Sequence, residues 1–327
     1  MKRTGVLLLQ MGGPTSLEEV EPYLVRLFSD RDLVRLPPPL SWFQGPLARF
    51  VARRRAPGVR EQYRAIGGAS PNNRVTVELA DRLQKRLAGE GDFRCFAAMT
   101  YTAPRTREAL EAALEADCRE LVALPLFPHY CEASTGASFS DLERARAALG
   151  PGLPPVRRIR RWYDRPDYLD ALAARVRRSL EEARAADPEA PVLVVSAHGV
   201  PEALPRRGDP YVEEVRRTVE LLRPRLPQGL RIELAWQSKA TPFPWVGPAA
   251  DATLEALGRQ GVRNVVVLPV SFVHDHLETL YEIDQLLREL ALGAGVRAYR
   301  RVPLFNADPD LVEVLRNLVL EEFGRRA

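Results

Sequence analysis

The segment PVLVVSA (residues 191–197) is a short apolar run with no alternating polar residues. A run of this kind is typical of a parallel strand that other elements cover on both faces. Five further runs share the pattern, at residues 5–11, 93–101, 120–127, 231–236 and 264–272. The sequence therefore predicts six buried strands.

Stretches rich in alanine, leucine, arginine and glutamate separate these runs. In the stretch at 106–121, Leu110, Ala113, Leu114 and Cys118 fall on one stripe of a helix. Strand and helix signals that alternate in this way predict a doubly wound α/β fold with parallel sheets.

A chain of 327 residues is long enough for two domains. The proline- and glycine-rich segment LGPGLPPV (149–156) is the best candidate for a linker between them. We therefore expect one domain at 1–150 and a second at 151–305. The final helical stretch, 306–327, is expected to return to the first domain.

Charged residues are spread along the chain, and the net charge is only +4. A nucleic-acid binder would more often concentrate its basic residues on one face or arm. The three cysteines, Cys95, Cys118 and Cys131, lack the spacing of a metal site, which favours reduced thiols. No apolar run reaches the roughly 18 residues that span a bilayer, and no cleavage site follows the apolar start. We therefore expect a cytoplasmic protein.

Polar residues follow some of the apolar runs, at the strand ends where open α/β sheets bind their ligands. His198 follows the run at 191–197, and its ring can titrate near neutral pH. A histidine tied to a backbone carbonyl is the structural alternative. The chain has neither a GxxxxGKS/T motif nor a GxGxxG motif after a strand, so a nucleotide ligand is not indicated.

A second polar cluster, HDHLE (274–278), follows the run at 264–272. His274, His276 and Glu278 are two residues apart and would share a face in extended backbone, but not in a helix. A carboxylate beside an imidazole stabilises the imidazolium and orients the ring. His276 and Glu278 are thus a candidate proton-accepting pair or a loose metal site. The alternative is a solvated helix start with acidic residues in its first turn.

Three other segments suggest binding or packing roles. The loop AWQSKATPFPWVGP (235–248) can line a site for a flat apolar ligand, or can simply pack as a loop. In RRRAPGVREQYRAIGGASP (53–71), arginine guanidinium groups match carboxylates, unless the segment is a solvated basic face. His129, in LFPHYCEASTG (126–136), is more consistent with a structural role.

Six ordered segments over nearly the whole chain resemble the ferrochelatase family, whose members insert ferrous iron into a porphyrin. The segments are LLLQMGGP (7–14), RLFSDRDL (26–33), EQYRAIGGASP (61–71), SAHGVP (196–201), WQSKATPFPWVGP (236–248) and VSFVHDHLETLYEID (270–284). The resemblance implies two Rossmann-like domains of the class II chelatase type, with a cleft between them and no nucleotide. It also implies a lyase of heme biosynthesis that converts protoporphyrin IX to protoheme and releases two protons.

The resemblance further implies roles for individual residues. His198 lies at the inner face of the porphyrin site, and Glu278 and His276 lie on the opposite wall as catalytic residues. Fe²⁺ is a substrate rather than a cofactor, and His198 and Glu278 are its implied ligands. The implied porphyrin contacts are Met11, Phe272 and Trp245 on the apolar walls, Arg55, Tyr63 and Ser70 at the carboxylates, and Tyr101.

Departures from the family pattern bear on the metal. Thr100 and Tyr101 stand where some members have arginine, or lysine followed by histidine, which leaves the outer route of metal delivery open. His274 replaces the small residue usual before the aspartate, either as a weak ligand or without a role. Some members bind an iron–sulfur cluster through C-terminal cysteines, but the last cysteine here is Cys131. We therefore expect no cluster and no other cofactor.

Three alternatives remain open. The substrate could be coproporphyrin III instead of protoporphyrin IX. A related chelatase for cobalt and a more acidic tetrapyrrole would usually be shorter and richer in histidine than this chain, which has four. A non-catalytic tetrapyrrole carrier would keep the apolar walls but would not need both His198 and Glu278. As partners we expect a porphyrin and ferrous iron, no nucleic acid and no transmembrane segment, with a monomeric chain and peripheral membrane contact left open.

Overall fold

The computed structural model describes residues 2–34, 39–239 and 244–324. The chain divides into two compact units, unit 1 (Met1–Arg161 and Phe305–Ala327) and unit 2 (Trp162–Leu304). The division differs from the predicted boundary at residue 150. The strand at Val156–Arg158 pairs with a strand of unit 1, and it therefore belongs to that unit and not to the second.

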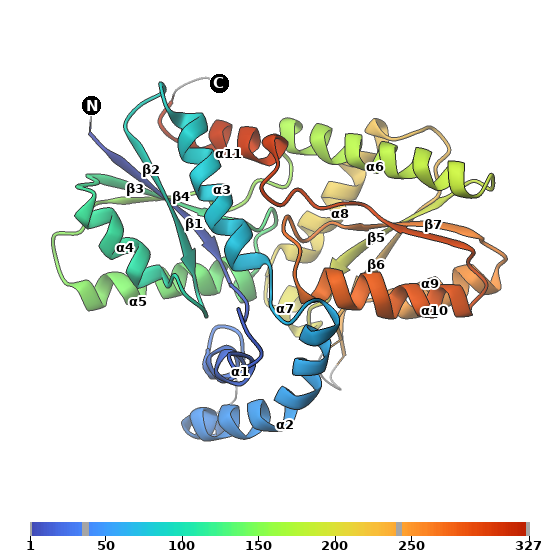
Figure 1. Cartoon of the computed structure of the whole chain (residues 1–327), viewed down its shortest axis with the longest axis horizontal. Coiled ribbons are helices and arrows are strands. Elements are labelled where there is room, and N and C mark those ends of the chain that lie inside the picture. Colours follow the sequence, from blue (N-terminus) through green and yellow to red (C-terminus); the bar gives the residue numbers. More distant parts are fainter. Residues whose placement is uncertain (1, 35–38, 240–243, 325–327) are drawn as a thin grey trace. The chain divides into compact units, whose positions relative to one another are not determined.

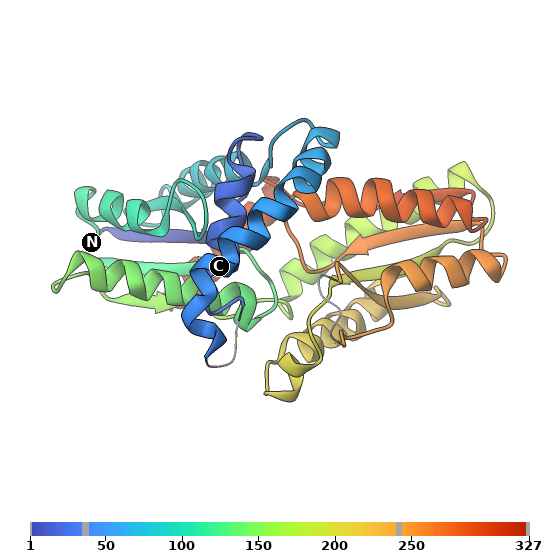
Figure 2. The ribbon, with the colours of Figure 1, turned by 90° about the horizontal axis from the view of Figure 1, so that it is seen from below.

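Unit 1 contains a sheet of four parallel strands in the order β2-β1-β3-β4 (Figure 1). The strands are β1 (Thr4–Gln10), β2 (Phe93–Met99), β3 (Glu120–Pro125) and β4 (Val156–Arg158). Leu7 and Leu9 of β1 pack with residues of α4 (Thr106–Glu115) and α5 (Ala137–Leu149). Helix α3 (Asn72–Leu87) contacts β2 and α11 (Pro309–Glu322). Helices cover both faces of the sheet, as Figure 2 shows.

Two further helices of unit 1, α1 (Val20–Ser29) and α2 (Gln44–Ala65), follow β1 in the chain and precede α3. They pack against each other. The buried stripe of α2 is made largely of alanine, at Ala48, Ala52 and Ala56. Small side chains at four-residue spacing allow a second helix to approach closely. A 3₁₀ turn, η1 (Leu40–Phe43), precedes α2, and a short π-helix, η2 (Glu132–Gly136), precedes α5.

Unit 2 repeats the arrangement, with four parallel strands in the order β6-β5-β7-β8. The strands are β5 (Val192–His198), β6 (Ile232–Gln237), β7 (Asn264–Pro269) and β8 (Ala298–Arg301). One face packs against α9 (Ala250–Arg259), the π-helix η4 (Glu278–Leu287) and α10 (Arg288–Gly293). Helix α6 (Pro166–Ala186) contacts β7, β8 and α8 (Tyr211–Leu222). The remaining elements are α7 (Ala203–Arg206) and η3 (Arg223–Arg225).

The predicted α/β fold with parallel sheets is confirmed, and all six predicted strands are present. The sequence did not predict β4 and β8. Both strands lie at sheet edges and their residues are partly or fully exposed, so neither forms the continuous apolar run of a central strand.

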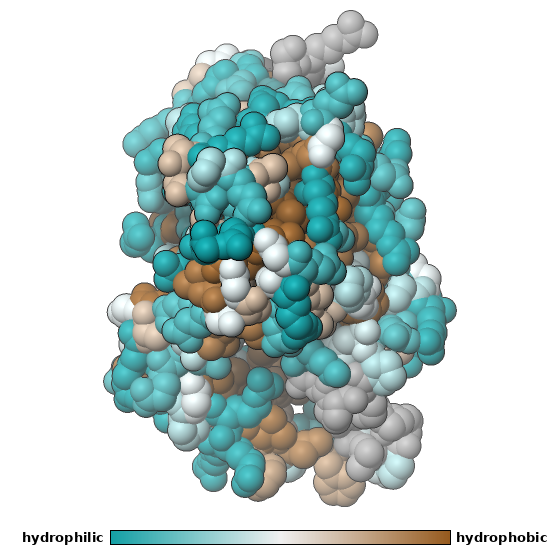
Figure 3. Space-filling model, turned by 90° about the vertical axis from the view of Figure 1, so that its right-hand side faces the viewer, coloured by the Kyte–Doolittle hydropathy of each residue, from teal (hydrophilic) through white to brown (hydrophobic). Residues whose placement is uncertain are grey.

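The surface is mainly polar on the face drawn in Figure 3, where apolar residues occupy limited areas between hydrophilic ones. This pattern agrees with charged residues that are interspersed along the chain. None of the helices in the described part of the chain combines the length and the apolarity needed to cross a membrane.

Candidate active site

His198 is the last residue of β5, a central strand of the unit 2 sheet. Its backbone N–H donates to Ser271 Oγ at 3.1 Å, and its carbonyl accepts a hydrogen bond from the Tyr211 hydroxyl at 3.0 Å. The oxygens of Tyr211 and Ser271 are themselves 2.6 Å apart. Because the backbone N–H and the carbonyl of His198 are both hydrogen-bonded, the backbone that carries the imidazole is fixed in position.

The turn after His198 requires glycine. A Cβ atom on Gly199 would lie 2.6 Å from the backbone oxygen of Gln237 and 3.2 Å from the ring of Trp245. The backbone at Gln237 belongs to β6 and cannot yield easily, so a side chain at position 199 would displace the turn. The close approach also places Trp245 beside the end of β5, near His198.

His276 and Glu278 lie in contact, with 2.9 Å between His276 Nδ1 and Glu278 Oε2. The extended backbone predicted for 274–278 is wrong, because Leu277 is helical and Glu278 begins the π-helix η4. The alternative prediction, that a helix begins in this segment, is correct for the backbone at Leu277 and Glu278. The pair still forms, because Glu278 at the first turn of the helix reaches back to the residue before the helix.

Phe272 contacts both histidine rings. Its ring centroid is 5.9 Å from that of His198 and 4.2 Å from that of His276, with edge-to-face angles of 75° and 85°. Phe272 therefore joins His198 to the His276–Glu278 pair in one continuous group, which we call the unit 2 site (His198, Phe272, His276 and Glu278). All four residues are candidate site residues in the sequence.

Burial and mutual charge set the protonation of this site. Burial lowers the pKa of His198, the Glu278 carboxylate partly offsets this, and His276 lowers the pKa further. Burial raises the pKa of Glu278, but the charge and hydrogen bond of His276, together with His198, outweigh it and bring the pKa to about 2. At neutral pH the site thus holds a neutral His198, able to accept a proton, and an ionised Glu278.

Two buried ring nitrogens of the site remain available. Among the described residues, neither His198 Nδ1 nor His276 Nε2 has a hydrogen-bond partner. An unpaired polar atom in a buried place is costly unless a ligand completes its bonding. These atoms can therefore accept a proton or bind a metal ion without breaking an existing hydrogen bond.

Glu282, one turn along η4, has a different environment. Its carboxylate accepts hydrogen bonds from the backbone N–H of Ser238 at 2.7 Å, from the Ser238 hydroxyl, and from Gln237 Nε2 at 3.1 Å. Burial and the neighbouring Glu278 raise its pKa, although the bonds from Ser238 and Gln237 lower it. Glu282 thus ties the segment after β6 to the π-helix.

His274 and His129 are both buried side chains. His274 is 1% exposed, and burial lowers its pKa to about 3. His129, in unit 1, is also buried, and burial lowers its pKa to about 3. Both rings are therefore neutral near pH 7, and His274 has almost no surface through which to meet a ligand.

The candidate site residues of unit 1 differ in their position and burial. Tyr63 and Ser70 are buried beside Gly13, where a Cβ atom would lie 2.6 Å from the side chain of Ser70. Met11, directly after β1, is partly buried. Arg55 lies on the exposed side of α2, with its guanidinium 5.5 Å from the ring centroid of Phe28.

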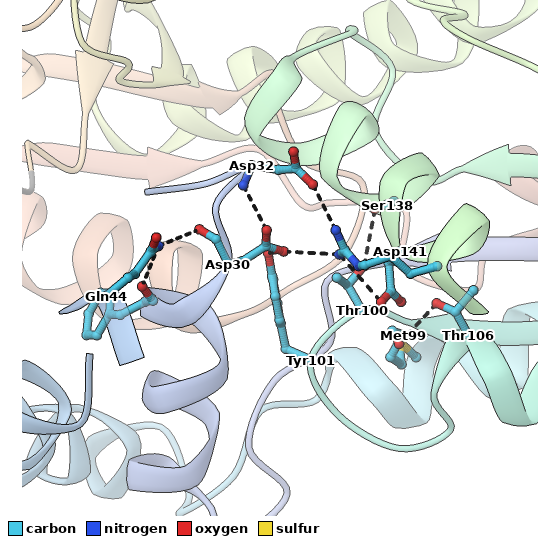
Figure 4. Close-up of polar contacts among 11 residues, drawn as sticks. Asp30, Asp32, Gln44, Met99, Thr100, Tyr101, Thr106, Ser138 and Asp141 are labelled. Atoms are coloured by element: carbon cyan, nitrogen blue, oxygen red, sulfur yellow. Dashed lines mark hydrogen bonds and ion pairs between the residues drawn. The ribbon is translucent and has the colours of Figure 1, made fainter. Parts of the chain in front are cut away.

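Tyr101 belongs to an internal polar network, drawn in Figure 4. Its hydroxyl donates to Asp30 Oδ2 at 2.8 Å, and burial, followed by the charge of Asp30, raises its pKa. Arg144 lies 3.0 Å from Asp32 and 3.6 Å from both Asp30 and Asp141. The hydroxyl of Tyr101 is thus already engaged within unit 1, which the sequence did not predict.

No closed metal cage is built into the chain as far as it is described, since no three His, Cys, Asp or Glu side chains gather as metal ligands there. The unit 2 site offers two imidazoles and one carboxylate around Phe272. Such donors suit a ferrous ion. An open set of donors also suits an ion that must be released again.

Comparisons with known proteins agree on one family. A sequence model of the ferrochelatase family matches residues 3–323. The ferrochelatase of Geotalea uraniireducens is 41% identical over 318 residues, which cover 97% of either chain. The ferrochelatase of Aquifex aeolicus is 38% identical over 320 residues, covering 98% of this chain and 99% of that one.

Solved structures show a similar fold. SirB from Bacillus subtilis, solved with Fe³⁺, has a TM-score of 0.56 at 11% sequence identity, over 98% of this chain and 96% of SirB. DR2241 from Deinococcus radiodurans, a multi-domain protein with structural similarity to chelatases, has a TM-score of 0.51 at 14% identity. That match covers 100% of this chain and 56% of DR2241. At such identities the likeness concerns the fold alone.

Proposed function

This chain belongs to the ferrochelatase family, and we propose that it inserts Fe²⁺ into protoporphyrin IX to give protoheme in heme biosynthesis. The observation that carries the proposal is the unit 2 site. A neutral His198 is joined through Phe272 to an ionised Glu278, which lies in contact with His276. These are the two kinds of group that porphyrin metallation needs.

The reaction replaces two pyrrole N–H protons by one metal ion. His198 is suited to accept a proton, because its pKa is lowered and its Nδ1 has no partner among the described residues. Glu278 keeps a negative charge that attracts Fe²⁺ and helps to replace its water ligands. Glu278 and His276 can then pass on the second proton or hold the metal.

The porphyrin must be bent, because the nitrogen lone pairs of a flat macrocycle point into its plane. We assign Met11, Trp245 and Phe272 to the apolar walls that impose this distortion. Phe272 is the best supported of the three, since its ring is fixed by edge contacts with His198 and His276.

We assign Arg55, Tyr63 and Ser70 to the carboxylates of the porphyrin. A guanidinium can bind a carboxylate through two parallel hydrogen bonds. The exposure of Arg55 leaves its fork available, whereas Tyr63 and Ser70 are buried next to Gly13. We also infer that Tyr101 acts through its network with Asp30, because its hydroxyl is already engaged.

No iron–sulfur cluster or other cofactor is part of the proposal. Burial raises the pKa of both Cys95 and Cys118, which disfavours the thiolates that a cluster requires. Purified protein should therefore lack visible absorption and acid-labile sulfide. A brown protein that contains both would contradict this part of the proposal.

We further propose a cytoplasmic, monomeric chain with peripheral membrane contact through residues 42–50. Trp42 is 78% exposed and Phe50 is 65% exposed, with Phe43 and Leu47 exposed beside them. Arg49 and Arg53, also exposed, suit anionic headgroups. The double variant Trp42→Ser/Phe50→Ser should lose binding to phosphatidylglycerol vesicles, whereas Leu286→Ser in unit 2 should retain it. Equal vesicle binding by the wild type, the double variant and Leu286→Ser would contradict membrane contact through residues 42–50.

The function is tested by incubating the purified protein anaerobically with Fe²⁺ and each porphyrin. We expect heme to form from protoporphyrin IX faster than from coproporphyrin III. A faster reaction with coproporphyrin III would favour that alternative substrate. Porphyrin that binds while Fe²⁺ is not consumed would identify a tetrapyrrole carrier and would contradict an enzyme.

A further inference from the structure

The helix that begins at Glu278 is a π-helix, η4 (Glu278–Leu287). Its hydrogen bonds run between residues five apart, a geometry that is rare, usually confined to a single turn and frequent at functional sites. This one extends over 10 residues. Contacts from outside the helix are therefore expected to stabilise the widened turns, and β8 supplies them.

Two side chains of β8 point toward η4. Successive residues of a strand face opposite sides of its sheet. Arg300 pairs with Glu182 of α6 at 2.8 Å, which assigns it to the α6 side. Tyr299 and Arg301, on either side of Arg300, face the other way and both reach η4.

Tyr299 contacts the backbone of the π-helix. Its hydroxyl donates to the carbonyl oxygen of Ile283 at 2.8 Å. Ile283 lies in the middle of η4, and its side chain is fully buried in the core of unit 2. Tyr299 thus binds the helix at a point that the core already holds.

Arg301 contacts the chain on both sides of the His276–Glu278 pair. Its guanidinium lies 2.8 Å from Asp284, in η4, and 2.9 Å from Asp275, directly before His276. The arginine side chain is 12% exposed. A buried guanidinium between two carboxylates is strongly oriented, because moving it would leave charges unpaired.

The contact with Asp275 continues to His276. Thr279 Oγ1 lies 3.1 Å from Asp275 Oδ1 and accepts a hydrogen bond from the backbone N–H of His276 at 3.0 Å. Arg301 is therefore linked through Asp275 and Thr279 to the residue that pairs with Glu278. A shift of Arg301 would be transmitted to both members of the pair.

We propose that Tyr299 and Arg301 are positioning residues, which hold η4 in its π form and thereby keep His276 and Glu278 in contact for metallation. The role in metallation rests on the proposed function. The effect on the helix itself does not depend on it, and the two parts can be measured separately.

The first measurement is the rate of iron insertion by Tyr299→Phe, Arg301→Gln and Arg301→Lys, with Arg300→Gln as the matched control. We expect Arg301→Gln to lower kcat by roughly 10- to 100-fold, because small misplacements of reacting groups have effects of this size. Arg301→Lys should recover part of the loss. The KM for porphyrin should change little, since neither residue is assigned to the macrocycle. Losses no larger than that of Arg300→Gln would contradict the proposal.

The second measurement is coupling to the site. If Arg301 acts through the His276–Glu278 pair, Arg301→Gln should cost much less in a Glu278→Gln background than in the wild type. Additive losses would mean that Arg301 acts independently of the pair, and would overturn its role as a positioning residue.

The third measurement is amide hydrogen exchange of residues 277–287 in the folded variants. Exchange should accelerate in Tyr299→Phe and in either Arg301 variant, and should stay unchanged in Arg300→Gln. If the wild type inserts no iron but this pattern holds, the proposed function fails and the support of the helix stands. If exchange is unchanged in every variant, the support itself is refuted, whatever the activity.

Discussion

His198 carries the most specific chemical expectation among single residues, because its backbone is fixed and its ring is neutral. The variant His198→Ala removes the proposed proton acceptor and leaves Phe272 and the His276–Glu278 pair in place. Loss of a general base typically costs roughly 10²- to 10⁴-fold in rate, and we expect a loss in this range. The rate of heme formation gives the loss, and quenching of intrinsic fluorescence shows whether porphyrin still binds.

Two outcomes would argue against this role of His198. Activity within about a factor of three of wild type would exclude it as the base, on the same scale. Loss of porphyrin binding together with activity would instead place His198 in substrate binding. The hydroxyl of Tyr211 provides a graded comparison, because Tyr211→Phe removes its bond to the His198 carbonyl and its contact with Ser271 but leaves the imidazole itself.

Glu278 and Glu282 form a natural pair for comparison, because they lie on one helix with opposite pKa shifts. Glu278→Gln removes the charge that pairs with His276, so we expect a large loss of kcat. Glu282→Gln keeps an amide that can still accept from Ser238, so we expect a small loss of activity. Steady-state kinetics of both variants test this. Equal losses would mean that the acidic residues act only as a diffuse field.

At the scale of elements, α2 combines an exposed basic face with a buried alanine stripe. We expect Arg55→Ala to raise the KM for porphyrin about fivefold with kcat nearly unchanged, since an exposed ion pair contributes about 1 kcal/mol. Arg54→Ala, on the same helix, is the matched control and should leave KM unchanged. Methyl esters of the porphyrin should not distinguish Arg55→Ala from wild type. An unchanged KM for the porphyrin with free carboxylates would mean that Arg55 does not bind them and is only part of a solvated basic face.

Central strands could be predicted from the sequence because burial on both faces leaves a continuous apolar run. The edge strands β4 and β8 could not, since Arg157, Arg158, Arg300 and Arg301 interrupt any such run. The π-helix could not be predicted either. Its apolar residues fit an ordinary helical stripe, and the extra residue per turn depends on contacts with β8 that are distant in sequence.

The candidate site could be predicted where its residues lie close together in sequence or match a family segment, as His198, His276 and Glu278 do. The residues that support it could not. Tyr211, Ser271, Tyr299 and Arg301 act through contacts made only in the folded chain, and their types are common in any α/β protein. The engagement of Tyr101 by Asp30 is hidden for the same reason.

For the complete chain, stability should depend on pH through buried histidines in both units, because burial lowers the pKa of His129 in unit 1 and of His198 and His274 in unit 2. Burial lowers the pKa of His129 and of His274 from 6.5 to about 3. Between these values the unfolded chain binds more protons than the folded chain, so the free energy of unfolding falls as the pH decreases. Glu278, with a pKa lowered from 4.5 to about 2, continues the loss at lower pH.

Urea denaturation between about pH 8 and pH 4 checks this dependence. We expect a steady loss of stability below the ordinary histidine pKa of 6.5. The variants His129→Gln and His274→Gln should each show a shallower dependence than wild type, even if they are less stable at neutral pH. A wild-type stability that does not change over this range would mean that both rings take up protons as readily in the folded chain as in the unfolded chain.

Iron insertion by the unit 2 site can be tested through its stoichiometry, by counting the protons released during a single turnover. Excess protein is mixed anaerobically with protoporphyrin IX and Fe²⁺ in weak buffer, and proton release is followed together with heme absorbance. Metallation by the unit 2 site predicts two protons released for each Fe²⁺ consumed, with proton release and heme formation complete together. Porphyrin that binds with no proton release and no loss of Fe²⁺ would rule out metallation and identify the chain as a tetrapyrrole carrier.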